Sequence, residues 1–348
     1  MRAARFDTRT RALGVRQVPV PEPGPTEVLV RVRACGICLS DVHLIDGTLP
    51  SPLPVVTPGH EASGVVERPG ALAAGWRPGQ RVVMAGGGPC GTCAMCARGR
   101  AEDCWAPRIM GFGYDGAWAE YVVVPAGALT EIGEDLPFEQ AAVLADAVAT
   151  PYAGLVERAA LRPGEAVGLW GIGGLGVHAV QIARLVGAAP IIAVDPLPAA
   201  RQRALDLGAD AALDPAGDPA GDVTAEVLRI TGGRGLDLAV DLVGANAVLA
   251  QAASCLGRRG RLLMIGLSAE PVALGPSALF GVSSHSLLGH LGYAKRHLDQ
   301  LVDLVAAGRL DVSGSVSDTV ALDDVADGVR RLASKEGNPI RLVVTPDR

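Results

Sequence analysis

Short apolar runs separated by glycine and proline dominate the first 150 residues. The runs are rich in valine and cover 27–36, 80–86 and 119–125, and breakers such as PEPGPTE and WRPGQ lie between them. Many short runs of this kind, with turn residues between them, are typical of an all-β unit closed as a barrel. We therefore expect residues 1–150 to form a β-rich, barrel-like domain.

The pattern changes near Thr150 to an alternation of strands and helices. Residues 164–195 are typical of strand, glycine turn, helix and strand, followed by a helix at 197–210, a strand at 236–244, a helix at 247–257 and a strand at 260–267. Such alternation predicts βαβ units around a parallel sheet. The fold class is therefore α/β, with a doubly wound Rossmann domain at 151–288. An amphipathic helix at 295–308 and a strand at 339–346 follow it.

Composition and charge narrow the classes of function. The 348 residues are 49% hydrophobic and 20% charged, with a formal net charge of -6, which is typical of a globular protein. The chain carries neither a lysine and arginine cluster of the nucleic-acid type nor an apolar run long enough for a membrane helix. The N-terminus lacks the apolar core of a secretory signal. We expect a cytoplasmic enzyme with no nucleic-acid or membrane partner.

A glycine turn between strand and helix predicts a dinucleotide site. Its glycines, in the order G-I-G-G-L-G, are Gly171, Gly173, Gly174 and Gly176. Glycines at this spacing let backbone amides approach a pyrophosphate at a helix N-terminus. Asp195 ends the next strand, where its carboxylate would bind ribose hydroxyls and repel a 2′-phosphate. The pattern favours NAD over NADP.

Seven cysteines are present, four of them within fifteen residues. The cluster consists of Cys90, Cys93, Cys96 and Cys104. Four thiolates on one loop can close a tetrahedral zinc site with no open position, which predicts a structural zinc. An iron–sulfur cluster uses the same ligands, so the spacing alone leaves it open. The odd total argues against a framework of disulfides.

Two further segments carry side chains that could bind a catalytic metal. ACGICLSDVH contains Cys38, and PGHEASG contains His60 beside Glu61. Neither segment is a metal motif by itself, because catalytic zinc needs three protein ligands and an open position. Asp146 stands alone in the apolar stretch AAVLADAVATPYAG, where a carboxylate needs a partner or a cation.

Taken together, these motifs resemble the zinc-dependent medium-chain dehydrogenases of the alcohol dehydrogenase type. The similarity covers nearly the whole chain and also rests on DGAWAEYVVV and PIRLVVTP. It implies a GroES-like catalytic domain at 1–150 that holds both zinc ions, and a return segment at 289–348 that completes this domain. It also implies a small alcohol or carbonyl substrate, and a homodimer or homotetramer.

The resemblance assigns the catalytic metal site. Cys38 and His60 match the first two zinc ligands, and Asp146, six residues before an aromatic residue, takes the place of the third. Glu61 is the rival ligand. Asp41 matches the carboxylate that orients the ligand histidine, whereas Cys35 and Cys255 receive only packing roles.

The resemblance also assigns proton transfer and cofactor contacts. Ser40 matches the hydroxyl that takes the alcohol proton, and His43 matches the base that releases it to solvent. Positions that match cofactor contacts are Thr150, Leu175, Val243, Ile265, Leu267 and, as a clasp for the cofactor phosphate, Arg341. Leu39 departs from the family because some members carry a basic residue there, so we expect weaker phosphate contacts.

These features predict an NAD-dependent zinc alcohol dehydrogenase that acts on a primary or secondary, hydrophobic alcohol. A polyol, amino-alcohol or cyclic-alcohol dehydrogenase on the same fold is the nearest alternative. An enoyl or quinone reductase needs no metal, and a non-catalytic nucleotide-binding protein needs no proton path, so both fit the residues less well. Trp105, Phe112 and Leu291 are candidates for lining the substrate pocket.

Overall fold

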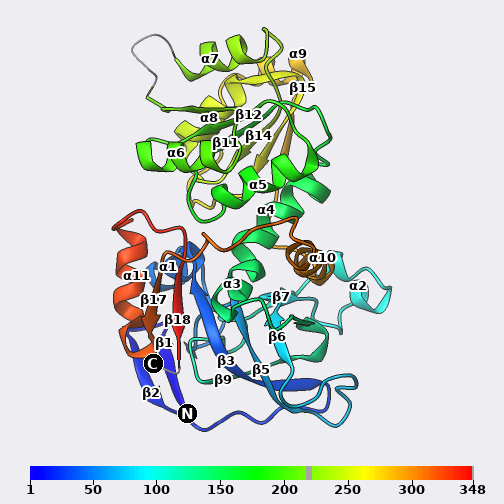
Figure 1. Ribbon diagram of the computed structural model, residues 1–348, viewed down its shortest axis with the longest axis vertical. Helices are drawn as coiled ribbons and strands as arrows, with labels where there is room; N and C mark the ends of the chain where they lie inside the picture. The colour runs from blue at the N-terminus through cyan, green and yellow to red at the C-terminus, as the bar shows by residue number, and fades with distance from the viewer. Residues whose placement is uncertain (217–221, 347–348) are drawn as a thin grey trace. The chain divides into compact units, whose positions relative to one another are not determined.

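The computed structural model describes residues 1–216 and 222–346, and the chain divides into two compact units (Figure 1). Unit 1 comprises Met1–Ala149 and Tyr293–Arg348, and unit 2 comprises Thr150–Gly292. The return segment therefore packs with the N-terminal residues.

A seven-stranded sheet forms the centre of unit 1. Its longest strand, β3 (Glu27–Ile37), pairs antiparallel with β5, β9 and β18. The other strands of the sheet are β5 (Ala62–Pro69), β6 (Arg81–Met84), β9 (Tyr121–Pro125), β10 (Leu129–Glu131), β17 (Asp318–Ala321) and β18 (Leu342–Thr345). The strands expected at 27–36, 80–86, 119–125 and 339–346 are confirmed. Because β18 pairs directly with β3, the C-terminal strand completes a sheet that the N-terminal residues begin.

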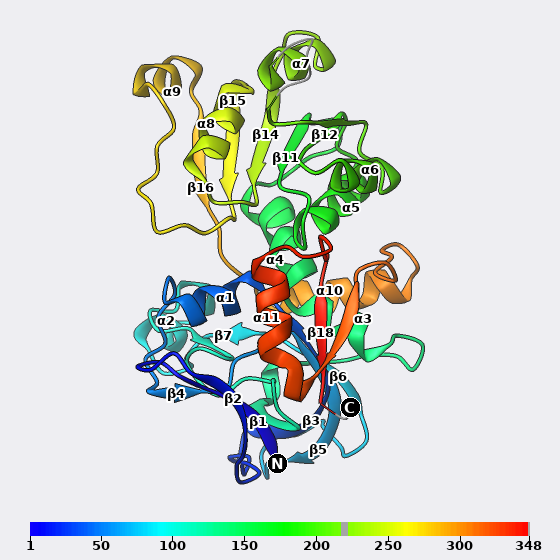
Figure 2. The ribbon, with the colours of Figure 1, turned by 90° about the vertical axis from the view of Figure 1, so that its left-hand side faces the viewer.

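Smaller elements surround this sheet. A three-stranded sheet contains β1 (Arg2–Asp7), β2 (Leu13–Gln17) and β4 (Val55–Val56), and β7 (Gly87–Gly88) pairs with β8 (Arg108–Ile109). The helices are α1 (Leu39–Asp46), α2 (Ala94–Ala97), η1 (Ala101–Asp103), η2 (Ala126–Ala128), α3 (Phe138–Val143), α10 (Lys295–Ala306), η5 (Leu322–Asp324) and α11 (Val325–Ala333). Helix α11 packs on α1, β3, β17 and β18 (Figure 2). This contact brings the return segment close to the loop that precedes α1.

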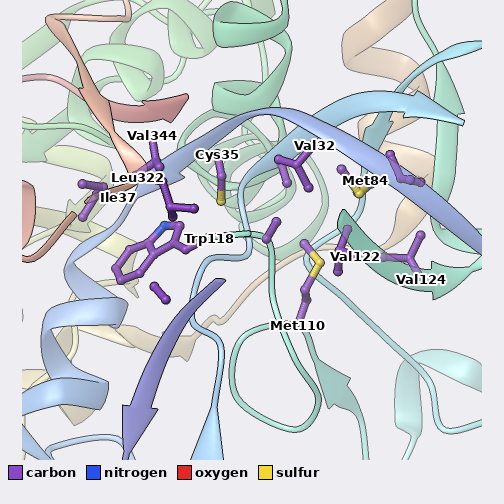
Figure 3. Close-up of a cluster of buried hydrophobic side chains, with 14 of the residues drawn as sticks. Val32, Cys35, Ile37, Met84, Met110, Trp118, Val122, Val124, Leu322 and Val344 are labelled. Carbon is purple, nitrogen blue, oxygen red and sulfur yellow. The ribbon is translucent and has the colours of Figure 1, made fainter. Parts of the chain in front are cut away.

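The core of unit 1 forms around Trp118. Its indole is fully buried with Cys35, Ile37 and Val344, and its Nε1 donates a hydrogen bond to Gly36 O at 3.2 Å (Figure 3). A buried indole needs such an acceptor, because an unpaired N–H in an apolar core is costly. The predicted packing role of Cys35 is confirmed.

Unit 2 is a six-stranded parallel sheet in the order β13-β12-β11-β14-β15-β16. The strands are β11 (Val167–Trp170), β12 (Ile191–Val194), β13 (Ala211–Leu213), β14 (Leu236–Asp241), β15 (Leu256–Met264) and β16 (Ser286–Gly289). The helices are η4 (Ala153–Arg158), α5 (Gly176–Val186), α6 (Pro198–Asp206), α7 (Val223–Ile230), α8 (Asn246–Ser254) and α9 (Ser277–Ser283). This is the strand order of a doubly wound fold, and the order reverses at β11. Right-handed crossovers therefore place α5 and α6 on one face of the sheet and α8 on the other (Figure 2).

The polypeptide between the two units is continuously helical but irregular. Helix α3 is followed by η3 (Leu144–Val148), α4 (Ala149–Tyr152) and η4, and both η segments are π-helical. Within η3, the Ala149 N–H bonds to the Leu144 carbonyl five residues earlier. Single π-turns inside α-helices are frequent at functional sites. The sequence pattern predicted no such change of pitch.

Candidate active site and metal centres

Asp41 organises the loop at the start of α1. Its Oδ2 accepts a hydrogen bond from Cys38 N at 2.9 Å, and its Oδ1 accepts one from Gly59 N at 3.3 Å. The same Oδ1 lies 3.3 Å from Nδ1 of His60. Asp41 is fully buried. One carboxylate therefore bonds the backbone at Cys38 and lies against the ring of His60, a position compatible with the expected role of orienting a ligand histidine.

The other ring nitrogen of His60 points toward the remaining donors. Nε2 lies 3.1 Å from Ser40 Oγ and 3.9 Å from Asp146 Oδ2. The Phe112 ring meets the imidazole edge-on at 5.8 Å between centroids. Burial opposes protonation of His60, but the carboxylates of Asp41 and Asp146 outweigh it and raise its pKa. With Asp41 at Nδ1, Nε2 is the nitrogen left to face a metal.

Asp146 reaches this cluster from the π-helix η3. Its Oδ2 lies 3.4 Å from the sulfur of Cys38. Donor atoms of Cys38, His60, Glu61 and Asp146 all lie within 4.8 Å of one another. The three side chains that sequence analysis chose as zinc ligands thus converge, although 108 residues separate Cys38 from Asp146.

The donor set fits a zinc ion. Tetrahedral bonds of about 2.3 Å to sulfur and about 2.0 Å to oxygen would separate these two atoms by about 3.5 Å, and the observed separation is 3.4 Å. Burial raises the pKa of Cys38, and the carboxylate of Asp146 raises it further. A divalent cation is the partner that lets an adjacent thiol and carboxyl ionise together.

Glu61 lies beside these ligands but is held in an ion pair. Its Oε1 is 3.1 Å from Nη2 of Arg341, and both side chains are almost completely buried. Burial raises the pKa of Glu61, while the guanidinium opposes that rise. A Cβ atom at Gly36 would lie 2.0 Å from Glu61 Oε2, so any side chain there would displace the Glu61 carboxylate. Glu61 belongs to the cluster, and its role as a rival ligand stays a prediction.

Arg341 is buried beside Glu61 and contacts the backbone at the end of β3. Only 2% of the residue is exposed, and Nη1 donates a hydrogen bond to Ile37 O at 3.2 Å. Its guanidinium balances the Glu61 carboxylate and secures the end of β3. Any contact of Arg341 with the cofactor phosphate stays a prediction.

The proposed proton path starts on α1. Ser40 and His43 lie one helical turn apart, and Ser40 Oγ is next to the metal-facing nitrogen of His60. His43 is half-buried, with Nδ1 3.5 Å from Asp46 Oδ2. Leu39, next to Cys38, is 46% exposed.

The four clustered cysteines form the second metal centre. Sulfur–sulfur distances are 4.0 Å for Cys90–Cys96, 3.5 Å for Cys93–Cys96 and 3.9 Å for Cys93–Cys104. A tetrahedron of bonds near 2.3 Å has edges of about 3.8 Å. Hydrogen bonds from Thr92 and from Cys93 N lower the pKa of Cys90 to about 6, which favours the thiolate that zinc requires. The donor set therefore fits a closed structural zinc site.

The glycine turn of unit 2 has the geometry of a dinucleotide loop. Gly171 has φ 93°, and a Cβ atom at Gly176 would lie 2.0 Å from Gly171 O. A Cβ atom at Gly173 would meet nothing within 4 Å, so that side of the loop can face a ligand. Gly174 and Leu175 lead directly into α5. Tight packing within the turn and open space outside it are what a bound pyrophosphate needs.

Asp195 lies at the carboxyl end of β12. Its Oδ2 accepts a hydrogen bond from Ile172 N and its Oδ1 one from Leu197 N, each at 2.8 Å. A carboxylate has further lone pairs for ribose hydroxyls, so both contacts are compatible with the predicted role. They also link the acidic residue to the glycine turn.

Other predicted cofactor contacts surround the carboxyl ends of β14, β15 and β16. Val243 is 44% exposed, Ile265 is buried, and Leu267 lines a cavity of about 380 Å³. Thr150 is buried, and its carbonyl lies 3.0 Å from His290 Nε2. Ligands bind at this edge of doubly wound sheets. His290 also lines the cavity, and sequence analysis gave it no role.

The candidate pocket residues separate in the structure. Phe112 contacts His60, and Leu291, although 70% exposed, lines the cavity of about 380 Å³ with Leu267 and His290. Trp105 is 69% exposed. Tyr293 was missed altogether. Gly86 N donates a hydrogen bond to its hydroxyl at 3.0 Å, and the hydroxyl donates one to Ala145 O, directly before Asp146. Desolvation of the hydroxyl raises the pKa of Tyr293 well above its usual range, so it stays a donor. The only sequence signal for a role of Tyr293 was its position near the start of the return segment.

Comparisons with known proteins agree with this geometry. The family profile for the alcohol dehydrogenase GroES-like domain matches residues 24–134, and the profile for zinc-binding dehydrogenases matches 174–307. An NAD-dependent alcohol dehydrogenase of Saccharolobus solfataricus is 32% identical over 95% of this chain and 96% of its own. The chain belongs to the zinc-dependent medium-chain dehydrogenase family.

Solved structures support the same assignment. The alcohol dehydrogenase of Aeropyrum pernix is 30% identical and superposes with a TM-score of 0.89 over 99% of this chain and 100% of its own. The 2R,3R-butanediol dehydrogenase of Bacillus subtilis is 26% identical, with a TM-score of 0.87 over 99% of both chains.

Family membership settles the coarser predictions. It confirms the GroES-like and Rossmann fold class, and an alcohol dehydrogenase that works with zinc and NAD. Among residues 1–216 and 222–346, no helix has both the length and the apolar character needed to cross a bilayer.

Proposed function

We propose that this dehydrogenase oxidises a primary or secondary alcohol reversibly at the site formed by Cys38, His60 and Asp146. The convergence of one thiol, one imidazole and one carboxylate on a common point supports this assignment. Zinc bound there would lower the pKa of the alcohol, and NAD would accept the hydride.

The roles of the side chains follow from their positions. Asp41 Oδ1 lies 3.3 Å from Nδ1 of His60, where it is placed to favour a proton on Nδ1 and so leave the lone pair of Nε2 for a metal. Ser40 Oγ, 3.1 Å from this Nε2, is placed to accept the alcohol proton. His43, one turn further along α1, then carries the proton toward solvent.

The net charge of the ligand set supports an ordinary zinc alcohol dehydrogenase chemistry. One thiolate, one carboxylate and a neutral imidazole balance Zn²⁺, and beside them the buried guanidinium of Arg341 lies 3.1 Å from Glu61. Asp146 therefore supplies the same charge as a second thiolate would. The four-cysteine loop would hold a second, structural zinc.

The finer properties also belong to this proposal. Asp195, whose carboxylate would repel a 2′-phosphate, supports NAD over NADP. We assign the enzyme to the cytoplasm as a homodimer or homotetramer. The similarity to a butanediol dehydrogenase makes diols the second substrate class to examine.

Metal analysis combined with a substrate screen tests the proposal. The purified enzyme should contain two zinc ions per chain. It should also form NADH with primary or secondary alcohols, and the absorbance of NADH measures this formation. Polyols, diols and cyclic alcohols complete the screen. One zinc or none, or a lack of NADH formation with every alcohol, would contradict the proposed site.

A further inference from the structure

The Tyr293 hydroxyl joins the helical segment that carries Asp146 to the backbone that lies beside His60. It accepts a hydrogen bond from Gly86 N at 3.0 Å and donates one to Ala145 O. Ala145 directly precedes Asp146 in η3. Gly86 lies against His60, since a Cβ atom at Gly86 would be 2.6 Å from His60 O. One phenol oxygen thus links the backbone beside one ligand to the backbone that supports the other.

The irregular pitch of η3 explains why such a link is useful. A π-turn widens the helix and disturbs its regular ladder of hydrogen bonds, so the direction of its side chains is set less firmly than in an α-helix. Asp146 lies in the middle of this π-turn. A short side chain has little reach, so the backbone must bring its carboxylate to the cluster.

We propose that Tyr293 is a positioning residue that sets the separation between His60 and Asp146 in the catalytic metal site. This inference rests on the proposed function, since it concerns the same two ligands. Tyr293 acts through Gly86 and Ala145, so it is not itself a ligand. Its contribution is to hold the site in the geometry that the metal requires before the metal binds.

The variant Tyr293→Phe tests this role because it removes only the hydroxyl. The zinc-loaded, full-length enzyme is challenged with a chelator, and the zinc released is counted over time. Loss of an outer hydrogen-bond partner typically costs 10–100-fold in metal affinity, so one zinc should leave about 10–100-fold faster than in the parent. The zinc of the four-cysteine loop serves as the internal control and should leave at the parent rate.

Tyr121→Phe is the matched control, because Tyr121 is a half-buried tyrosine of the same unit on strand β9. It should release both zinc ions at the parent rate. The inference would be overturned if Tyr293→Phe and the parent released zinc at the same rate. It would also be overturned if zinc left both metal sites faster by the same factor, because that result indicates a general loss of structure. Replacement of the catalytic zinc by cobalt adds a spectroscopic readout, in which the visible bands should shift in Tyr293→Phe and stay unchanged in Tyr121→Phe.

The results also separate this inference from the proposed function. A parent enzyme with a single zinc contradicts the function, whereas a parent with two zinc ions and an unchanged Tyr293→Phe contradicts only the role of Tyr293. If Tyr293→Phe does not fold, hydrogen exchange of the parent enzyme tests the positioning role of Tyr293 instead. Peptides containing Gly86 should exchange more slowly when the catalytic zinc is present, and equal exchange with and without it overturns the inference.

Discussion

Replacing Arg341 by methionine removes the cation of a buried ion pair. Arg341 and Glu61 have side chains that are 3% and 0% exposed, and their charged atoms lie 3.1 Å apart. The variant Arg341→Met keeps a long apolar stem but leaves Glu61 buried without its guanidinium. It also removes the hydrogen bond from Nη1 to Ile37 O.

The expected cost follows from this burial. Breaking a buried pair by removing one partner typically costs about 3–5 kcal/mol, because the remaining acid must either keep its charge in a medium of low polarity or take up a proton. For a unit of this size, each kcal/mol lowers the melting temperature by about 2–4 °C. Arg341→Met should therefore melt roughly 6–20 °C below the parent. An exposed pair would cost about 1 kcal/mol or less.

Urea unfolding of the zinc-loaded enzyme, combined with a double-mutant cycle, measures this energy. The variant that also carries Glu61→Gln has neither charge, so it should be more stable than Arg341→Met alone. If Arg341 instead acted mainly on the cofactor phosphate, Arg341→Met would raise KM for NAD and lower stability by less than about 1 kcal/mol. That outcome, or additive single effects in the cycle, would refute the reasoning.

Three other variants probe the metal, cofactor and pH behaviour. Asp146→Ala should lose turnover and one of two zinc ions while NAD binding, measured by fluorescence, persists; near-parent activity would contradict its role as a ligand. Asp195→Ala should narrow the preference for NAD in kcat/KM, and a parent that prefers NADP would contradict the assignment. Burial raises the pKa of Glu165, but the hydrogen bond from Arg261 outweighs it and lowers the pKa. The ion pair of Glu165 and Arg261 therefore stabilises the fold above the usual carboxyl pKa, and this stabilisation is lost as the pH falls. Glu165→Gln should lower the free energy of unfolding, measured in urea, by about 0.5–1 kcal/mol at neutral pH and by little in acid. An equal loss at both pH values would count against this reasoning.

The fold could be predicted because each unit repeats a simple pattern. Alternating strand and helix runs predicted the parallel sheet of unit 2, and the glycine turn appears where β11 passes into α5. In unit 1 the valine-rich runs became β3, β6 and β9. Such elements are dictated by periodicity and turn residues, which are local properties of the sequence.

The part of the site that could be predicted is the set of metal-binding side chains. Cys38, His60 and Asp146 were assigned as donors through the resemblance to the family, and the structure brings them together. The π-turn around Asp146 was not foreseen, because a run of small apolar residues is compatible with either helical pitch. The partner of Glu61 was not foreseen either, because 280 residues separate it from Arg341 and no local pattern connects them.

Both missed contacts have the same origin in the chain. Tyr293 bonds the backbone beside Asp146, and Arg341 pairs with Glu61. Both belong to the C-terminal part of unit 1, Tyr293–Arg348. All four donors of the metal cluster come from residues 1–149, and its two acids depend on contacts with these C-terminal side chains. Because Arg341 directly precedes β18, which pairs with β3, the contact between Arg341 and Glu61 is coupled to the pairing of these two strands. The return segment is therefore part of the metal site as well as of the fold.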